Sequence, residues 1–340
     1  MNGSFWDALP RPIIGLAPMY GITDHPYRHI QKKYGNPAVV FTEFVQVEEL
    51  CAGVRRALNT LRYDESQRPI VAQLFGHTPR YFRRAALVIA ALGFDGIDIN
   101  MGCPTKSVAQ SGAGAALIRT PDLARAIIDA THAGVRDWVE GAGLREGSRL
   151  STAAVAQVEA RRQRLPPAYQ QRRSIPVSVK TRIGYDEPAT GEWIPRLLDA
   201  RPAVISLHGR TLRQRYAGEA QWDEIAQAAE FARAAAVPLL GNGDIQSIED
   251  AQKLVAATGV DGVLIGRASC GNPFVFCADG QGATPLRPNN CWKSRWNMQT
   301  SLPTVSAQQS AIRLSPCASI WPGMPGAHRT APRCARRCYT

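Results

Sequence analysis

The residues best suited to chemistry lie on a loop that follows a predicted strand. The alternating apolar run Gly96–Asn100 predicts the strand, and the loop after it carries Cys103 and Lys106. A thiol on a loop just past a strand end is placed for reaction rather than for packing. Because a free thiol is mostly protonated at neutral pH, Cys103 is a candidate acid. A lone cysteine is more often structural, but this setting favours catalysis.

The elements that must position this loop alternate between short apolar strands and amphipathic helices, from residue 13 to about residue 270. Eight strands with intervening helices predict a (β/α)8 barrel, an α/β fold, and not an open doubly wound sheet. The predicted strands are Ile13–Met19, Ala38–Phe44, Ile70–Phe75, Gly96–Asn100, Val177–Ile183, Ala203–His208, Val237–Asn242 and Gly262–Gly266. The predicted helices include Pro26–Tyr34, Pro79–Leu92, Pro121–Val139, Trp193–Ala200, Trp222–Ala235 and Ser247–Thr258.

In such a barrel the active site lies where the strands end at their C-termini. The loops after the seventh and eighth strands contain Gly243, Gly266 and Arg267, which are the glycine backbone and the cation that a phosphate cradle needs. The alternative is that these glycines only make tight turns. An inward Lys180 at a strand end is costly to bury without an anionic partner, such as a phosphate or a reduced flavin.

Two further strand-end residues have two interpretations each. A lone histidine such as His208 is most often a satisfied core residue, but its place beside Gly209 and Arg210 favours contact with a ligand. The amide of Gln73 could pair with buried backbone or contact the edge of a planar ring.

Composition narrows the class of protein. The 340 residues carry a net charge of +12, which suits a polyanionic partner such as nucleic acid. No run of about 18 apolar residues appears, and the first eleven residues lack the layout of a signal peptide, so we expect a cytoplasmic protein. No C-x-x-C pair occurs, so we expect neither a zinc site nor another metal site.

An insertion, Gly141–Arg173, interrupts the alternation of strands and helices before the fifth strand, and it carries seven arginines. Because it enters a strand from the N-terminal end, we expect it at the end of the barrel opposite the active site. Its middle, Thr152–Arg164, predicts an exposed helix. A charge run of this kind is most often a solvated face, and contact with RNA is the alternative.

The last segment, residues 277–340, is rich in Pro, Ser, Arg, Trp and Cys and has neither helical nor strand periodicity. It holds eight Lys and Arg against one acidic residue. Gly271–Phe276, by contrast, has the pattern of an entry to the eighth helix. We therefore divide the chain into a barrel domain, residues 1–276, and an irregular, disordered tail, for which a frameshift is our hypothesis.

The site residues and their neighbours together resemble the tRNA-dihydrouridine synthase family of flavoenzymes. The resemblance covers about residues 12–276 in the family's order. Its specific part is the NMGCP core together with the K-x-R-x-G and HGRT motifs; the glycine turns alone would not be specific. The matching segments are LAPMYGITDHPYR (Leu16–Arg28), TEF (Thr42–Phe44), VAQLFG (Val71–Gly76), DINMGCPTK (Asp98–Lys106), VSVKTRIG (Val177–Gly184), HGRT (His208–Thr211), GNGDI (Gly241–Ile245) and IGRAS…NP (Ile265–Pro273).

The resemblance implies reduction of the 5,6 double bond of particular uridines in tRNA, with FMN as cofactor and NADPH as reductant. Cys103 would donate a proton to one carbon while reduced flavin delivers hydride to the other, and Asn100 would orient the uracil. The target base would have to leave its stack. Further substrate-binding candidates are Lys106, Arg182 and Arg210. The flavin-binding residues that the resemblance implies are Pro18 and Met19 along the flavin, Gln73 and Lys180 at its ring, and His208, Asn242, Gly243, Asp244, Gly266 and Arg267 at its phosphate end and ring edge.

Two alternatives stay open. One is another FMN barrel that acts on a free pyrimidine, which would share the phosphate loops and Lys180. The other is a non-catalytic RNA-binding barrel, because residues 277–340 do not resemble the helical domain that family members carry after the barrel. We also expect the protein to be a monomer.

Overall fold

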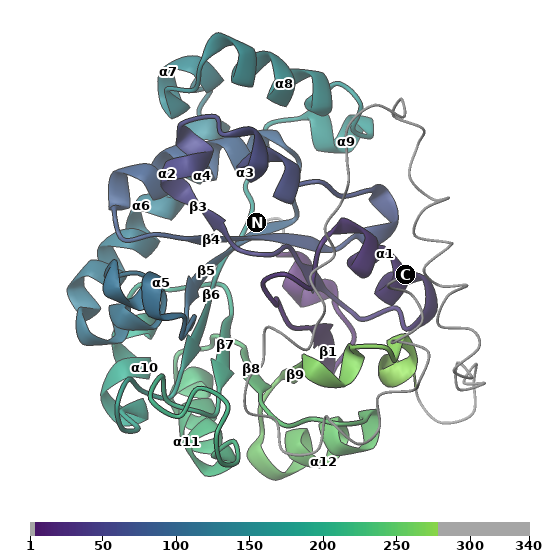
Figure 1. Ribbon diagram of the computed structural model, residues 1–340, viewed down its shortest axis with the longest axis vertical. Helices are drawn as coiled ribbons and strands as arrows, with labels where there is room; N and C mark the ends of the chain where they lie inside the picture. The colour runs from purple at the N-terminus through teal and green to yellow at the C-terminus, as the bar shows by residue number, and fades with distance from the viewer. Residues whose placement is uncertain (1–3, 278–340) are drawn as a thin grey trace, which may run out of the picture. The chain divides into compact units, whose positions relative to one another are not determined.

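Nine parallel strands form the centre of the computed structural model, which describes residues 4–277 (Figure 1). Their order is β1-β9-β8-β7-β6-β5-β4-β2, with β3 also paired to β4. Two backbone hydrogen bonds close the ring between β1 and β2, from Leu16 N–H to the Val39 carbonyl at 3.0 Å and from Ala38 N–H to the Ile14 carbonyl at 2.9 Å. The strands are β1 Ile13–Leu16, β2 Val40–Phe41, β3 Val45–Gln46, β4 Ile70–Phe75, β5 Gly96–Met101, β6 Val177–Arg182, β7 Ile205–His208, β8 Leu239–Asn242 and β9 Gly262–Ile265.

β2 and β3 together occupy one position of the barrel, because both pair with β4. The eight predicted strand positions are therefore confirmed, but the predicted single strand Ala38–Phe44 is wrong. The physical cause is Thr42, whose hydroxyl accepts the backbone N–H of Gln73 at 3.0 Å. The Thr42 hydroxyl thus takes the place of a backbone carbonyl as the acceptor for Gln73, and the β-strand is interrupted between β2 and β3.

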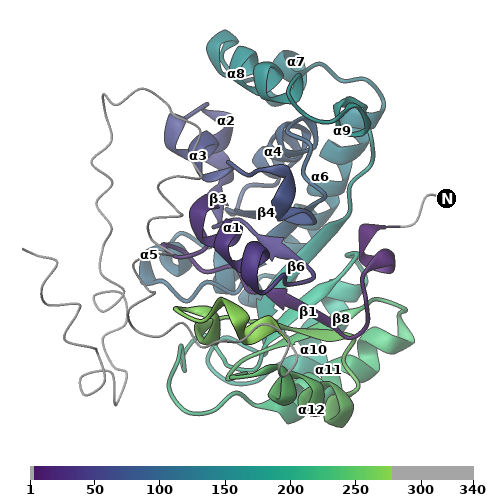
Figure 2. The same ribbon diagram turned by 90° about the vertical axis from the view of Figure 1, so that its right-hand side faces the viewer.

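The two ends of the barrel differ in chemistry. At the N-terminal end, Trp6 of the 3-10 helix η1 (Phe5–Ala8) is 2% exposed and packs against Phe41, with ring centroids 6.4 Å apart. Val71 and Leu240 belong to the same apolar cluster. Residues two apart on a strand share a face. On β4 and β8 this face is apolar at Val71 and Leu240, and it becomes polar at Gln73 and Asn242, toward the C-terminal end of the barrel. Figure 2 shows η1 at one end of the barrel and α5 at the other.

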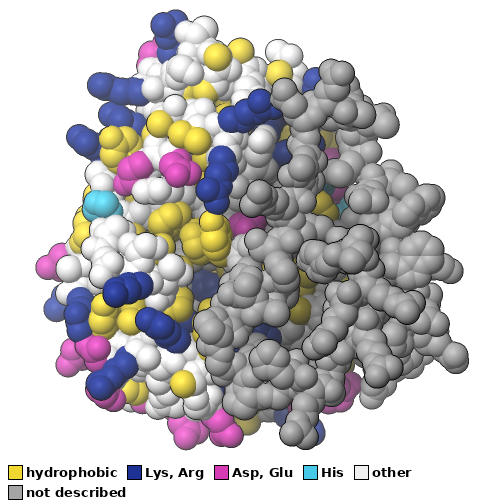
Figure 3. Space-filling view, viewed as in Figure 1, with side chains coloured by type: hydrophobic (Ala, Val, Ile, Leu, Met, Phe, Trp, Pro, Cys, Tyr) yellow, Lys and Arg dark blue, Asp and Glu magenta, His cyan; other side chains and the backbone are white. Residues whose placement is uncertain are grey.

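The outer layer consists of helices that pack their apolar faces on the strands. Figures 1 and 3 look onto the C-terminal end, where Lys and Arg side chains lie among hydrophobic ones. The helices are α1 His25–Tyr34, α2 Val47–Cys51, α3 Arg55–Thr60, α4 Pro79–Ala91, α5 Lys106–Gln110, α6 Pro121–Val139, α7 Leu144–Ser148, α8 Thr152–Arg162, α9 Pro167–Gln170, α10 Thr190–Leu198, α11 Trp222–Ala234 and α12 Ile248–Thr258. The remaining 3-10 helices are η2 Glu65–Gln67, η3 Gly114–Arg119, η4 Arg267–Ser269 and η5 Pro273–Phe276.

The six predicted helices are present, with bounds that differ by up to three residues. α10 begins at Thr190 rather than Trp193, and it accommodates Pro195 in its interior instead of in the first turn that prolines prefer. The predicted entry to an eighth helix is the 3-10 helix η5. The predictions for residues 278–340, including disorder and a frameshift, lie outside the described residues.

The insertion forms α7, α8 and α9, and its middle helix is close to the one predicted. α7 and α8 pack on the outer side of α4, along the side of the barrel, and Figure 2 places only α9 toward the N-terminal end. The expected position at the end opposite the active site is therefore only partly right, because α8 also contacts the segment of α2 and α3. Four of its seven arginines bind neighbouring carbonyls. Their acceptors are the carbonyls of Leu58 for Arg161, Gln170 for Arg162, Trp138 and Ala142 for Arg172, and Phe94 for Arg173.

Some of these arginines also lie over aromatic rings. The guanidinium of Arg172 is 4.1 Å from the ring centroid of Trp138, and that of Arg173 is 4.1 Å from the centroid of Tyr169. A guanidinium over an aromatic face is attracted by the ring quadrupole. These contacts attach the insertion to the barrel, while Arg145, Arg149 and Arg164 are exposed.

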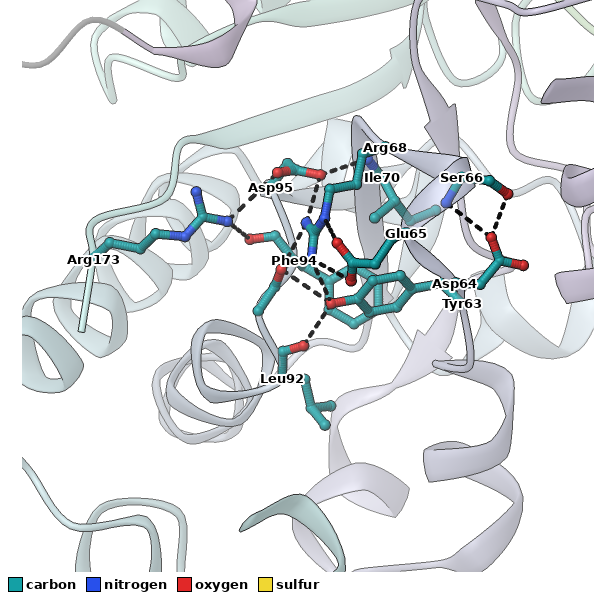
Figure 4. Close-up of polar contacts among 11 residues, drawn as sticks. Tyr63, Asp64, Glu65, Ser66, Arg68, Ile70, Leu92, Phe94, Asp95 and Arg173 are labelled. Carbon is teal, nitrogen blue, oxygen red and sulfur yellow. Dashed lines mark hydrogen bonds and ion pairs between the residues drawn. The ribbon is translucent and has the colours of Figure 1, made fainter. Parts of the chain in front are cut away.

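A buried ion pair joins the starts of β4 and β5 beside the insertion (Figure 4). Arg68, whose side chain is 12% exposed, contacts Asp95 at 3.0 Å, and the Asp95 carboxylate also accepts the backbone N–H of Ile70 at 2.8 Å. Arg68 lies over the Tyr169 ring at 3.4 Å. The Asp95 carboxylate therefore holds an arginine, a strand start and, through Arg173 at 3.5 Å, the end of the insertion.

We expect Asp95→Ala to lower the free energy of unfolding by about 1–3 kcal/mol, because it leaves the buried Ile70 N–H without its acceptor. It also removes one of the two carboxylates that hold Arg68, the other being Glu65 at 2.6 Å. Urea denaturation of the full chain measures this change. Glu187→Ala is the matched control, since Glu187 pairs with Arg213 at 3.8 Å on the surface, with both side chains more than 70% exposed; its effect should stay within about 0.5 kcal/mol. Equal effects of the two substitutions would contradict a structural role for the buried pair.

Candidate active site

A chain of hydrogen bonds leads from the barrel interior to the Cys103 loop. The wholly buried carboxylate of Asp98 on β5 accepts the amide Nε2 of Gln73 at 2.7 Å and the hydroxyl of Ser178 at 2.8 Å. Asn100 Nδ2 donates to Gln73 Oε1 at 3.0 Å. Asn100 Oδ1 in turn accepts the backbone N–H of Cys103 at 2.9 Å and that of Gly102 at 3.1 Å.

The orientation of each amide in this row of hydrogen bonds follows from Asp98, because an ionised carboxylate can only accept hydrogen bonds. Asp98 requires the NH2 group of Gln73 to face it, so the oxygen of Gln73 faces Asn100, and the oxygen of Asn100 faces the loop. Burial raises the pKa of Asp98 to about 6, against the hydrogen bonds from Gln73 and Ser178. At neutral pH Asp98 is therefore mostly ionised, and the amide directions are set.

Cys103 lies in a small apolar pocket at the end of β5. It is 8% exposed and packs with Val108 and Ala113, against which Phe44 and Phe75 also lie. Its thiol donates to the hydroxyl of Thr105 at 3.2 Å. The thiol is thus packed closely, and its backbone is fixed by Asn100.

A second group of side chains, nearly all cationic, faces this loop from β6 and β7. Lys180 Nζ donates to Asn242 Oδ1 at 2.9 Å. Burial, and then the charge of Arg182, lower the pKa of Lys180 to about 8. Burial also lowers the pKa of His208 well below its usual value, with further contributions from Arg182, Lys180 and other cations. His208 is therefore neutral at pH 7.

Arg182 joins the Cys103 loop to the loop after β7. Its guanidinium donates to the carbonyls of Gly102 at 2.6 Å, Thr211 at 3.1 Å and Arg215 at 3.1 Å. Burial lowers its pKa to about 10, so it stays charged at neutral pH. Arg182 thus acts in the structure as a clamp between two loops; its predicted contact with substrate remains a prediction.

Asp244 organises the loops after β8 and β9. Its carboxylate accepts from Arg210 at 2.6 and 2.9 Å and from Arg267 at 2.6 Å. Partial burial alone would raise its pKa, but the hydrogen bonds from Arg210 and the Ala220 N–H, with the charges of both arginines, hold the pKa below its usual range. Gly243 has φ +136°, and a Cβ there would lie 2.6 Å from that of Ala220, so the turn requires glycine.

The remaining predicted residues are placed as follows. Pro18 and Met19 directly follow β1 and are half-buried. A Cβ on Gly266 would lie 3.6 Å from the Met19 sulfur, so the ends of β1 and β9 meet here. Lys106 is exposed at the start of α5. The structure therefore joins most of the predicted residues in contacting groups, with Lys106 at their edge.

Comparison with known proteins identifies the family. A family model described as dihydrouridine synthase matches residues 15–140 and 158–308. A probable tRNA-dihydrouridine synthase of Staphylococcus aureus (strain COL) is 35% identical over 282 residues, which are 81% of this chain and 74% of that protein. The probable tRNA-dihydrouridine synthase 2 of Bacillus subtilis (strain 168) is 35% identical over 281 residues, with the same coverage. The chain belongs to the dihydrouridine synthase family.

As a member of the dihydrouridine synthase family, the chain is a flavin-dependent oxidoreductase. Its fold is shared more widely: histamine dehydrogenase from Rhizobium sp. 4-9 superposes with a TM-score of 0.51 at 12% identity, over 84% of this chain and 46% of that one. The family match leaves out residues 141–157, which contain α7 and the start of α8, and it extends past the barrel to residue 308.

The charges at the C-terminal end of the barrel fit a flavin of this family. Three buried or half-buried cations, Lys180, Arg182 and Arg210, accompany Arg267 there. Asp244 forms ion pairs with Arg210 and Arg267, and the charge of Asp98 acts on Lys180 without an ion-pair contact. Burial lowers the pKa values of Lys180 and Arg182, and neither side chain has an ion-pair partner among the described residues. An anionic group such as a flavin phosphate would supply the missing charge.

Sequence analysis missed several residues that the structure places in the site. Asp98 and Ser178 lie two residues before Asn100 and Lys180 on their strands, so the two-residue period could have identified them. Tyr216 directly follows Arg215, whose carbonyl accepts a hydrogen bond from Arg182. No periodicity marks Tyr216, because it lies on an irregular loop.

Two structural findings bear on other predictions. Among residues 4–277, no helix has the length and apolar content needed to cross a bilayer. Within the same residues, no three metal-ligating side chains of His, Cys, Asp or Glu converge.

We expect Asn100→Ala to release the Cys103 loop, because it removes the acceptor of two backbone N–H groups. The rate of Cys103 alkylation by a small maleimide should rise by up to about thirtyfold, since two hydrogen bonds are lost and each is worth about 1 kcal/mol. Peptide mass spectrometry measures the rate at each cysteine. The buried Cys51 is the internal control and should react as slowly as before. An unchanged rate at Cys103 would show that Asn100 does not hold the loop.

Proposed function

We propose that this protein reduces the 5,6 double bond of specific uridines in tRNA to dihydrouridine, with FMN as cofactor and NADPH as reductant. The observation that supports this proposal most is the arrangement of Cys103. Its loop is fixed by Asn100 and Arg182 at the same end of the barrel as the cationic group around Lys180. The two relatives named above, whose names include the same activity, support the choice of tRNA.

In this proposal, separate residues of the chain bind FMN and donate the proton. Arg267 and the glycine turns at Gly243 and Gly266 would hold the phosphate of FMN, while Lys180 and Gln73 would contact its ring. Bound FMN, once reduced by NADPH, would supply the hydride. Cys103 would donate the proton from its thiol to the other carbon of the double bond, so one hydride and one proton are added in total.

The neutral His208 and the clamp Arg182 have supporting roles in this proposal. A neutral imidazole can accept or donate a hydrogen bond without adding to the positive charge of the site. Arg182 keeps the Cys103 loop and the loop of Tyr216 at a constant separation. The target uridine would enter between them after leaving its stack in the tRNA.

The decisive experiment supplies the purified full chain with FMN, NADPH and a tRNA transcript that lacks dihydrouridine. Mass spectrometry of the tRNA should show a gain of two hydrogens at a defined uridine. Free uracil and orotate should not stimulate NADPH oxidation. Turnover of the free pyrimidines but not of tRNA would favour a dehydrogenase of free bases, and a protein that does not retain FMN would favour a non-catalytic RNA-binding barrel.

We expect Cys103→Ala to retain FMN and NADPH oxidation but to lose at least about a hundredfold in dihydrouridine formation, the usual contribution of a general acid. Single-turnover reduction of tRNA by the pre-reduced enzyme measures the step directly. Cys270→Ala is the matched control, because Cys270 is an exposed thiol outside the Cys103 loop, at the end of η4. Product formation at the wild-type rate by Cys103→Ala would remove Cys103 from the acid role.

We expect the affinity of the apoprotein for FMN to fall as the pH rises through about 8. Lys180 is an ammonium below that pH and loses its charge above it, so its attraction for an anion is present at pH 7 and lost at pH 9. The change should approach at most tenfold per pH unit, since one proton is involved. Flavin fluorescence titrations between pH 6.5 and 9 measure the dissociation constant. Lys180→Met should bind more weakly and with a flatter profile; parallel profiles for the two proteins would contradict the assignment.

A further inference from the structure

Tyr20 is an exposed aromatic residue at the mouth of the barrel to which the mechanism assigns no role. Among the described residues, two aromatic side chains are strongly exposed, Tyr20 at 52% and Tyr216 at 42%. Tyr20 comes directly after Pro18 and Met19, which follow β1.

The ring of Tyr20 is held in a defined orientation. One face stacks on Phe44, with centroids 4.7 Å apart and planes 14° from parallel. Its hydroxyl accepts a hydrogen bond from Arg56 at 2.8 Å. The next residue, Gly21, has φ +74° and donates its N–H to Glu43 at 2.6 Å. A ring fixed on one face and at its hydroxyl presents its other face to solvent with little loss of side-chain entropy on binding.

This aromatic pair is continuous with the reactive thiol. Phe44 packs edge-on against Phe75, with centroids 4.7 Å apart, and both rings lie against the cluster that contains Cys103. Phe44 has this position because Thr42 interrupts the strand between β2 and β3. Phe44 therefore contacts both Tyr20 and the cluster of Cys103, which places Tyr20 beside the candidate active site.

We propose that the outward face of Tyr20 stacks on a base adjacent to the target uridine in the tRNA. This inference rests on the proposed function. When the target base leaves the stack, its neighbour loses a stacking partner, and an aromatic side chain replaces that contact for any base. Arg56, at the Tyr20 hydroxyl, is a cation placed beside the ring for the backbone phosphate, and Arg55 precedes it at the start of α3. The ring would contact the base of a nucleotide, and the arginine would contact its phosphate.

The experiment compares Tyr20→Leu, Tyr20→Phe and the wild-type chain, all as full-length protein loaded with FMN. Tyr20→Leu retains apolar volume but removes the flat face, whereas Tyr20→Phe retains the face and removes the bond to Arg56. We expect Tyr20→Leu to lose about tenfold in kcat/KM for tRNA, mainly through KM, and Tyr20→Phe to lose about threefold or less. Val139→Ala, at a 43% exposed apolar residue at the end of α6, is the surface control and should match the wild type.

A modified substrate tests the stacking contact itself. Once mass spectrometry has located the target uridine, transcripts with an abasic residue on its 5′ or 3′ side remove the neighbouring base. One of these transcripts should be a poor substrate for the wild type, and Tyr20→Leu should add no further loss on it, because the two changes remove the same contact.

The outcomes separate this inference from the proposed function. If the wild type makes no dihydrouridine in tRNA, the proposed function fails, and the stacking inference fails with it. If the wild type is active and the KM of Tyr20→Leu is unchanged, only the stacking inference is overturned. Loss of FMN from Tyr20→Leu, or additive losses with both abasic transcripts, would likewise overturn it, because Tyr20 would then support the cofactor or contact another part of the tRNA.

Discussion

The buried carboxylate of Asp98 is the constraint on which the site depends. It can only accept hydrogen bonds, so it determines which end of the Gln73 amide faces inward, and Gln73 determines the same for Asn100. The Asn100 oxygen then faces the backbone N–H of Cys103 and accepts a hydrogen bond from it. The Cys103 side chain itself makes none of these hydrogen bonds. A charge at the centre of a barrel is costly to bury. Here the hydroxyl of Ser178 and the nearby ammonium of Lys180 offset part of that cost.

Positive charge dominates the same end of the barrel. The pKa values of Lys180 and Arg182 are lowered, and His208 is neutral at pH 7, because these groups share a dry space with few carboxylates. The arrangement costs stability in the absence of an anion, which is typical of residues retained for binding rather than for folding. Asp244 relieves the repulsion locally by pairing with two arginines at once.

The insertion shows why a run of charge is ambiguous in a sequence. Its arginines were expected to form a solvated face or to contact RNA, yet Arg161, Arg162, Arg172 and Arg173 bind carbonyls of the chain itself. A guanidinium has five donors in one plane and can lie on an aromatic ring while it donates from its edge. Arginine therefore serves as a connector wherever irregular backbone leaves carbonyls unpaired.

The sequence by itself determined the barrel, its eight strand positions, the place of the Cys103 loop after a strand and the family, because strand periodicity and contiguous motifs are local properties. Only the tertiary structure decided the break at Thr42, the clamp of Arg182 and the direction of the Asn100 amide. Each of these depends on partners far away in the chain, such as Ser178, which lies 80 residues from Asp98. Helices of four to six residues, such as α2 and α9, also required the structure, because one turn is too short to show a period.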